Sequence, residues 1–510
     1  MPSCISINAF RASVLALAAG IAGCAAVGPE FQKPEAEVAD TWLEAHDPRV
    51  DTSSSAYQDW WAVFNDPVLD RLIATAYAEN LSLQVAGLRI LQARANLGFS
   101  IGLKYPQSQT IGTSFARSKS SENAPPFSSL PDDVASRIDT ETDFWGTSFD
   151  IAWEADIWGR FRRGIESAEA DLAANMLNFD AVLVTLTGDV ALTYTTIRTL
   201  EQRLAYLREN IAIQQRGLKL AETRFEFGAT SELDVAQSRS LLRSTEAAIP
   251  LLQMQISMTK NILSLLLGMP PSTLADILGS ETSIPNASQN AAVGIPADLI
   301  RRRPDVRAAE MAAAAQSAGI GVAAADLYPQ FVLAGSFGLA GESFSDQFGS
   351  GSASGFVAPL VNWNIFNYGR IKNNIRVQDA RFQQLLVAYE IVVLNAAREV
   401  EDGLVGFLRS QERVQYLEQA VVAAQRSVEL SLDQYESGLV DFQRVLNSQA
   451  SLLGLQDALA GARGQIASSL VSTYRALGGG WQLREGNGIV SPSTLETMRQ
   501  RTDWGDLLDN

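Results

Sequence analysis

The chain has 510 residues, of which 46% are hydrophobic, and its formal net charge is −17. The acidic residues are scattered and no basic stripe occurs, which argues against a nucleic acid as partner. The one histidine, His46, lies among polar residues, and the chain has no Gly-Lys pair of the kind found in phosphate-binding loops. The sequence therefore predicts a protein that is not an enzyme and holds no cofactor or metal.

The first 23 residues have the features of a signal peptide. Arg11 precedes an apolar run at 14–19, and Ile21-Ala22-Gly23-Cys24 follows. The run is too short for a transmembrane helix. Its end resembles the lipobox of bacterial lipoproteins, which makes Cys24 the lipid-modified first residue of the mature chain. The alternative is an ordinary secretory signal with an incidental cysteine. Cys4 leaves with the signal, so the mature chain has one cysteine and forms no internal disulfide. Ala25 implies the outer membrane, because an aspartate after the cysteine usually retains a lipoprotein in the inner membrane.

The second half of the chain repeats the first. Residue types match at a fixed offset for Trp153, Gly159, Arg160, Tyr206, Gly228, Ser238 and Gly268, whose partners are Trp363, Gly369, Arg370, Tyr416, Gly438, Ser448 and Gly478. A further matching pair, Tyr105-Pro106-Gln107 and Tyr328-Pro329-Gln330, has another offset because one loop is longer in the first copy. Two pseudo-symmetric copies of one long unit are therefore expected.

Each copy is predicted to begin with a helix, near 81–104 and 305–327, which the Tyr-Pro step ends. Two strands follow, with alternating apolar residues at 110–115 and 145–153 and again at 331–339. The fourth stretch, 355–363, is less regular and contains Pro359. The segment 118–141, rich in Ser, Pro and Asp, is expected to be a long solvated loop between the first two strands.

A very long helix comes next in each copy, near 167–227 and 377–437. About 60 residues at a rise of 1.5 Å make a rod of around 90 Å. Gly228 and Gly438 are suited to the left-handed turn that closes such a helix. A shorter helix returns to the Leu-Gly steps at 267–268 and 477–478. Alanine-rich stretches such as 312–315 favour close helix packing in a curved wall over the alternative of a generic coiled-coil stalk.

The strands limit the assembly if they enter a membrane. Four strands cannot close a barrel, and the hydrocarbon region does not tolerate open sheet edges. The smallest transmembrane barrels use about eight strands. Two chains would give eight strands and a filled interior, whereas three would give twelve and a passage.

Several segments resemble the TolC-like outer-membrane factors of the NodT lipoprotein type. They are Gly28-Pro29-Glu30-Phe31-Gln32-Lys33-Pro34, Trp60-Trp61-Ala62-Val63-Phe64-Asn65-Asp66-Pro67 with Leu69 and Leu72, the segment 301–310 that begins Arg301-Arg302-Arg303-Pro304, and the two hairpin turns at 224–242 and 434–453. The resemblance runs from Cys24 to about Trp481. It implies a mainly α fold with a membrane β-barrel, in which a homotrimer forms a twelve-stranded barrel above an α-helical tunnel that crosses the periplasm.

By this resemblance, the protein is a passive exit channel for small toxic compounds or drugs. An inner-membrane pump of the RND type would energise it through a periplasmic adaptor, and lipid of the outer membrane would surround it. A type I protein-secretion duct and a structural lipoprotein that spans the periplasm remain alternatives. The amphipathic strands favour a channel over a spacer.

The resemblance also divides the chain into parts. These are a signal peptide (1–23), a lipid anchor and collar segment (24–80), a first repeat (81–268), a connector that belongs to the collar (269–304), a second repeat (305–480) and a tail without periodicity or assigned function (481–510). Trp60 and Trp61 are expected to be packing anchors of the collar. The arginines at 301–303 are expected to pair with local acids, with anion binding as the alternative.

In the resembling family, contacts between neighbouring hairpins hold the periplasmic tip closed. The matching positions here are Asp234 and Tyr435, while Arg444 and Asn447 stand where relatives often place acids. This departure weakens the case for an acidic ring. Because Arg444 is the repeat equivalent of Asp234, an Asp234–Arg444 contact between hairpins is one candidate latch. The alternative is that both residues are solvated charges, which contribute about 0–1 kcal/mol.

Overall fold

The computed structural model describes residues 26–53, 58–125, 127–135, 137–280, 282–286, 290–296 and 301–508. Cys24 and the signal segment lie outside the described residues. The chain divides into two compact units. The first comprises the N-terminal residues through Lys33, Gln92–Ala173 and Met311–Leu386, and the second comprises Pro34–Leu91, Ala174–Glu310 and the chain from Val387 onward. Each unit takes segments from both halves of the chain.

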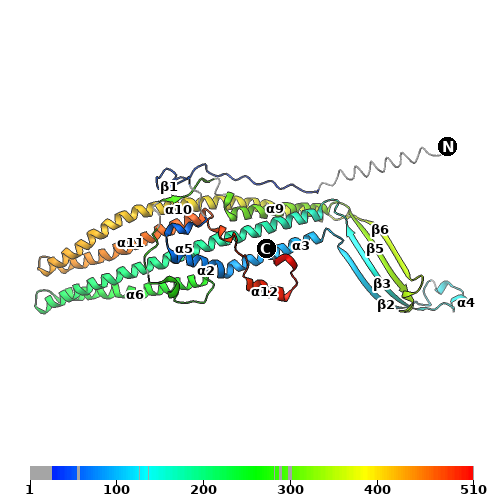
Figure 1. The fold of residues 1–510 in the computed structure, drawn as a ribbon, viewed down its shortest axis with the longest axis horizontal. Coiled ribbons are helices and arrows are strands. Elements are labelled where there is room, and N and C mark those ends of the chain that lie inside the picture. The colour runs from blue at the N-terminus through cyan, green and yellow to red at the C-terminus, as the bar shows by residue number, and fades with distance from the viewer. Residues whose placement is uncertain are drawn as a thin grey trace. The chain divides into compact units, whose positions relative to one another are not determined.

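The first unit contains a four-stranded antiparallel sheet (Figure 1). Its strands are β2 (Ser108–Lys119), β3 (Glu141–Glu154), β5 (Gln330–Gly341) and β6 (Ala353–Asn362), in the order β2-β3-β5-β6. The central pair joins the two halves of the chain, with Phe149 of β3 opposite Phe337 of β5. All four predicted strands are present. The irregular one, β6, is an edge strand of this sheet, where a proline such as Pro359 is tolerated.

The loops that join the strands differ in length between the two copies, as the sequence predicts. The β2–β3 connection contains the short helices η2 (Phe127–Ser129) and α4 (Asp132–Ala135). The β5–β6 connection holds only η3 (Asp346–Phe348).

The helices of the two copies have identical lengths. Each pair has 22, 67 or 35 residues: α3 (Leu81–Gly102) with α9 (Pro304–Ala325), α5 (Arg160–Glu226) with α10 (Arg370–Glu436), and α6 (Glu232–Leu266) with α11 (Phe442–Ala476). This correspondence confirms the predicted repeat of elements. The long helices begin earlier than the predicted Ser167 and Val377, because each starts directly after a glycine with φ near 80°, Gly159 or Gly369.

Apolar contacts fix the order of helices in the second unit. Leucines of α5 pack against Leu242, Leu252 and Ile256 of α6. Helix α5 also contacts α11 through a buried Asn210–Gln456 hydrogen bond of 2.5 Å and an Arg203–Asp457 ion pair. Val421 and Val428 of α10 pack against α11. Within this unit the helices therefore neighbour one another in the order α6, α5, α11, α10.

Helix α5 is apolar enough, by length and composition, to cross a membrane. However, 56% of its most apolar 18-residue stretch is buried inside the protein. This apolar character is therefore accounted for by packing within the chain.

Shorter elements surround the helices of the second unit. They are β1 (Val50–Asp51), which pairs in parallel with β4 (Ala291–Ala292), together with η1 (Trp60–Phe64), α2 (Pro67–Glu79) and α7 (Ala275–Leu278). The tail, for which the sequence predicted no element, forms η4 (Trp481–Arg484), α12 (Pro492–Arg501) and η5 (Gly505–Leu508). Met498 and Leu508 of the tail pack against Leu91 of α3.

Candidate gate at the hairpin turns

The two helical hairpins end in turns of the same geometry. Gly228 and Gly438 have φ of 68° and 73°, in the left-handed region that glycine adopts without strain. In both turns the glycine N–H donates to the carbonyl three residues earlier, at 2.9 Å. These bonds satisfy carbonyl groups that the helix end leaves unpaired.

Arg224 joins the two hairpins of the chain near their turns. It lies in the last turn of α5, and its guanidinium donates to the backbone carbonyls of Tyr435 and Glu436 at the end of α10. The guanidinium carbon also lies 4.8 Å from the centroid of the Tyr435 ring. A cation at a helix C-terminus and over an aromatic face is stabilising on both counts. Arg224 therefore ties the end of α5 to the end of α10.

Asp234 lies beside this contact. Its carboxylate accepts hydrogen bonds from the Thr230 hydroxyl and, at 3.3 Å, from the Tyr435 hydroxyl. Tyr435 is buried, and its ring is 4.9 Å from that of Phe442. Burial raises the pKa of Tyr435, and the nearby Asp234 charge acts in the same direction. The phenol therefore stays protonated at neutral pH and can donate to Asp234.

Arg444 and Asn447 lie on the exposed side of α11. Arg444 contributes its backbone N–H to the Asp441 side chain, which caps α11. The Asn447 side chain accepts from Gln443, one turn earlier on the same helix. Within the described part of the chain, no ion pair joins Asp234 to Arg444. The structure thus brings Asp234 and Tyr435 together, whereas Arg444 and Asn447 stand apart from them.

Little in the sequence indicates the role of Arg224. The residue contacts backbone carbonyls 211 and 212 positions away, and no local pattern records such a contact. The available signal is a break in the repeat, since the equivalent position in the second copy is Gln434.

The tryptophans predicted to anchor the collar are buried, as expected. Trp60 is 1% exposed, stacks on Tyr474 of α11 with 5.9 Å between ring centroids, and meets Trp61 edge to face. Arg303, one of the three consecutive arginines, pairs with Asp305 at 2.7 Å and with Glu399 at 3.1 Å. For Arg303, the prediction of local acidic partners is therefore correct.

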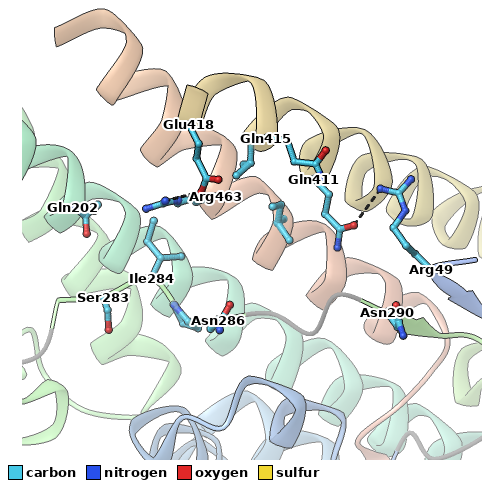
Figure 2. A pocket seen from close by; sticks show the side chains of 13 residues that line it. Arg49, Gln202, Ser283, Ile284, Asn286, Asn290, Gln411, Gln415, Glu418 and Arg463 are labelled. Carbon is cyan, nitrogen blue, oxygen red and sulfur yellow. Dashed lines mark hydrogen bonds and ion pairs between the residues drawn. The ribbon is translucent and has the colours of Figure 1, made fainter. Parts of the chain in front are cut away.

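A polar cavity of about 570 Å³ lies in the second unit between α10, α11 and the connector (Figure 2). Figure 2 shows Arg463 paired to Glu418 and Arg49 hydrogen-bonded to Gln411 at the wall of this cavity. Arg49 also pairs with Asp47 and Glu412, and its hydrogen bond lowers the pKa of Asp47 to about 2. Through its contacts with Gln411 and Glu412, Arg49 holds the segment 47–49 against α10.

Comparison with known proteins identifies the family. A family model for the outer membrane efflux protein matches residues 72–269 and 295–479. Pyoverdine export outer membrane protein OpmQ of Pseudomonas putida is 32% identical over 429 residues, which is 83% of this chain and 88% of that protein. Nodulation protein T of Rhizobium leguminosarum bv. viciae is 29% identical over 494 residues, or 96% and 97% of the two chains. The solved outer-membrane channel OprN is 28% identical, with a TM-score of 0.82, and the likeness covers 89% of this chain and 99% of that one.

These likenesses cover both repeats and confirm the resemblance to TolC-like, NodT-type proteins that the motifs predicted. They also confirm the predicted role in efflux and the predicted location in the outer membrane. The chain belongs to the outer membrane efflux protein family and is an outer-membrane efflux protein.

Proposed function

We propose that three copies of this chain form a passive exit channel, with a twelve-stranded barrel in the outer membrane above an α-helical tunnel. A periplasmic adaptor and an inner-membrane pump of the RND type would complete the assembly and supply the energy. The cargo would be small toxic compounds.

The repeat supports a closed ring of chains. Within one chain, α11 of the second copy packs against α5 of the first through contacts such as Arg475–Asp189 at 3.0 Å. In a ring of repeats, the equivalent contact joins α6 of the first copy in one chain to α10 of the second copy in the neighbouring chain. The face of α6 that corresponds to this part of α11 is an exposed apolar stripe at helical spacing, formed by Leu251, Met254, Met258, Ile262 and Leu265.

This apolar stripe has the composition and spacing of a helix face that packs against another helix. Because these side chains are about half exposed in the single chain, covering one of them stabilises an interface by about 1–2 kcal/mol. A repeated head-to-tail contact makes a ring when its rotation closes. This exposed stripe is the single observation that most supports the assembly.

Strand number supports three copies. The sheet has two open edges, β2 and β6, whose unpaired backbone groups would be costly in a membrane. Eight strands make a barrel whose interior side chains fill, and a passage needs more. Twelve strands from three chains meet both conditions.

Two measurements test the proposal. Native mass spectrometry in mild detergent should give three copies per particle, and planar bilayers should show single-channel conductance. A stable monomer that conducts would exclude the trimer, and a trimer without conductance would favour a spacer. The susceptibility profile of a strain that lacks the protein then tests the cargo class, with unchanged susceptibility to all small toxic compounds arguing against it.

A further inference from the structure

The junction between strands and helices is built twice from the same contacts. In the first copy, the Trp153 indole donates to the Lys104 carbonyl at 3.2 Å. In the second copy, Trp363 donates in the same way to the Leu327 carbonyl at 3.0 Å. The two junctions therefore share this tryptophan hydrogen bond, which places the loops before α5 and α10 at equivalent points of the two copies.

One aromatic contact joins the first copy to the second at this junction. Trp158 stacks on Tyr328, with 4.6 Å between ring centroids and 23° between the planes. The indole of Trp158 also donates to the Pro329 carbonyl at 2.8 Å. The loop before α5 is thereby fastened to the Tyr-Pro step before β5.

The equivalent aromatic residues have no such contact. Tyr368 is the repeat equivalent of Trp158, and Tyr105 is the equivalent of Tyr328. Tyr368 is fully exposed and Tyr105 is 64% exposed, and neither has a ring partner among the described residues. Tyr368 also has a φ of 49°, a left-handed conformation that costs energy for a bulky residue. The left-handed backbone distinguishes Tyr368 from Trp158, whereas the exposure of both tyrosine rings is expected of residues whose binding surface belongs to another chain.

We propose that Tyr368 of one subunit stacks on Tyr105 of the next subunit, where it fastens the loop before α10 to the neighbouring Tyr105–Pro106 step. This inference rests on the proposed trimer. The partner surface is a second copy of this chain, because the internal contact Trp158–Tyr328 supplies the geometry and a ring of repeats requires its counterpart between chains.

The same relation fixes how the sheets of neighbouring subunits join. Within the chain, Thr147 of β3 lies opposite Leu339 of β5. The strands of the two copies superpose with Ser108 of β2 on Gln330 of β5 and Trp153 of β3 on Trp363 at the end of β6, because this superposition carries the register of β2 with β3 onto the observed register of β5 with β6. Transferring the pair in this way places Val357 of β6 opposite Arg117 of the neighbouring β2. Val357 and Arg117 belong to β6 and β2, the two edge strands of the sheet (Figure 1), and are both exposed. The strands of neighbouring subunits therefore pair antiparallel in this register.

Paired cysteines test the register in the full-length protein in its membrane. Facing residues of an antiparallel pair have Cα atoms close enough for a disulfide. Val357→Cys with Arg117→Cys should give covalent trimer on a non-reducing gel, several times more than Val357→Cys with Phe115→Cys or Lys119→Cys. Those two controls lie on the same face of β2 but one residue pair out of register. Thr147→Cys with Leu339→Cys should close within one chain, and single-cysteine variants report any background from Cys24.

Substitution of the tyrosines tests the stack. Tyr368→Ala and Tyr105→Ala should each lower the temperature at which the trimer dissociates in detergent, and the double variant should do little more than either alone, because partners in one contact are not additive. Tyr368→Trp, which gives the loop the residue of the first copy, should keep the wild-type temperature. Phe366→Ala is the matched control, because this exposed residue of the same loop corresponds to Asp156, which caps α5.

The outcomes separate this inference from the proposed trimer. A trimer by native mass that cross-links preferentially out of register, or not at all, overturns the inferred seam and leaves the trimer standing. Additive or absent effects of the tyrosine variants overturn the stack, because they show that the two rings act independently or not at all. Absence of any trimer in the wild type overturns the proposed function itself.

Discussion

Arg224 acts at a point where the repeat is broken. Its guanidinium ties α5 to the last carbonyls of α10, whereas the second copy has Gln434 at the same position. Arg224→Gln should remove a cation–π contact and charge-assisted hydrogen bonds, together worth about 1–2 kcal/mol. We expect higher conductance of the isolated trimer in planar bilayers. Arg426→Gln is the control, since Arg426 pairs with Glu429 on its own helix, and an equal rise in conductance there would argue against a specific tie.

Substitutions of Asp234 and Arg444 test whether the hairpins of neighbouring chains contact each other. Within one chain the Asp234 carboxylate accepts from Tyr435, so Tyr435→Phe should remove that bond and keep the buried ring. If Arg444 of another chain also reaches Asp234, Asp234→Ala and Arg444→Ala should each raise conductance, and the double variant should add little. Asn447→Ala serves as the control on the same face of α11. Unchanged conductance in Arg444→Ala would leave Tyr435 and Arg224 as the residues that hold the tip.

Asp47 makes the contact between the segment 47–49 and α10 sensitive to acid. Its pKa falls from 3.8 to about 2 because Arg49 bonds to its charged form. A lowered folded-state pKa contributes stability that is present above the unfolded value and lost as the pH falls through the folded value. The melting temperature of the wild type should therefore fall between about pH 4 and about pH 2 more steeply than that of Asp47→Asn. Asp40→Asn, an exposed position in the same segment, should follow the wild type, and a wild-type slope in Asp47→Asn would exclude this role.

At the scale of elements, helices and strands were predicted best where the hydrophobic period continues over many residues. The proline-free apolar spacing of α5 and α10 indicated two very long helices, and the alternation in β3 indicated a strand. Helix α12 escaped prediction because ten residues with few apolar positions carry almost no periodic signal. The position of α12 is set by tertiary packing, in which Met498 contacts Leu91 of α3.

The contacts at the hairpin turns were predictable only in part, for a related reason. The turn glycines follow from helix termination, which is local chemistry, and Asp234 and Tyr435 came from the family resemblance. Arg224 binds a distant backbone, so its partner depends on how the hairpins pack. Sequence spacing within one helix cannot supply that information.

The apolar stripe of α6 makes a prediction at the same scale. Met258 lies at its centre and is exposed in the single chain. Met258→Asp should lower the trimer fraction seen by native mass spectrometry, because it places a charge without a partner in each seam. Gln253→Glu adds a negative charge to another face of α6 and should leave the trimer intact. Equal loss in both variants would indicate a general effect of charge on the helix.

For the whole molecule, the question is what keeps it in the membrane. A single acyl chain gives only marginal membrane binding, whereas two signals or a spanning structure anchor a protein firmly. If the barrel spans the membrane, the lipid expected on Cys24 assists anchoring but does not build the channel. Cys24→Ser should then lose labelling by a fatty-acid probe, remain a trimer by native mass, and retain partial export of a toxic compound. Persistent label on Cys24→Ser would place the modification elsewhere. Loss of the trimer in Cys24→Ser would show that the lipid is needed for assembly. If export by Cys24→Ser is reduced but the purified channel conducts normally in planar bilayers, the defect lies in targeting to the membrane and not in the pore.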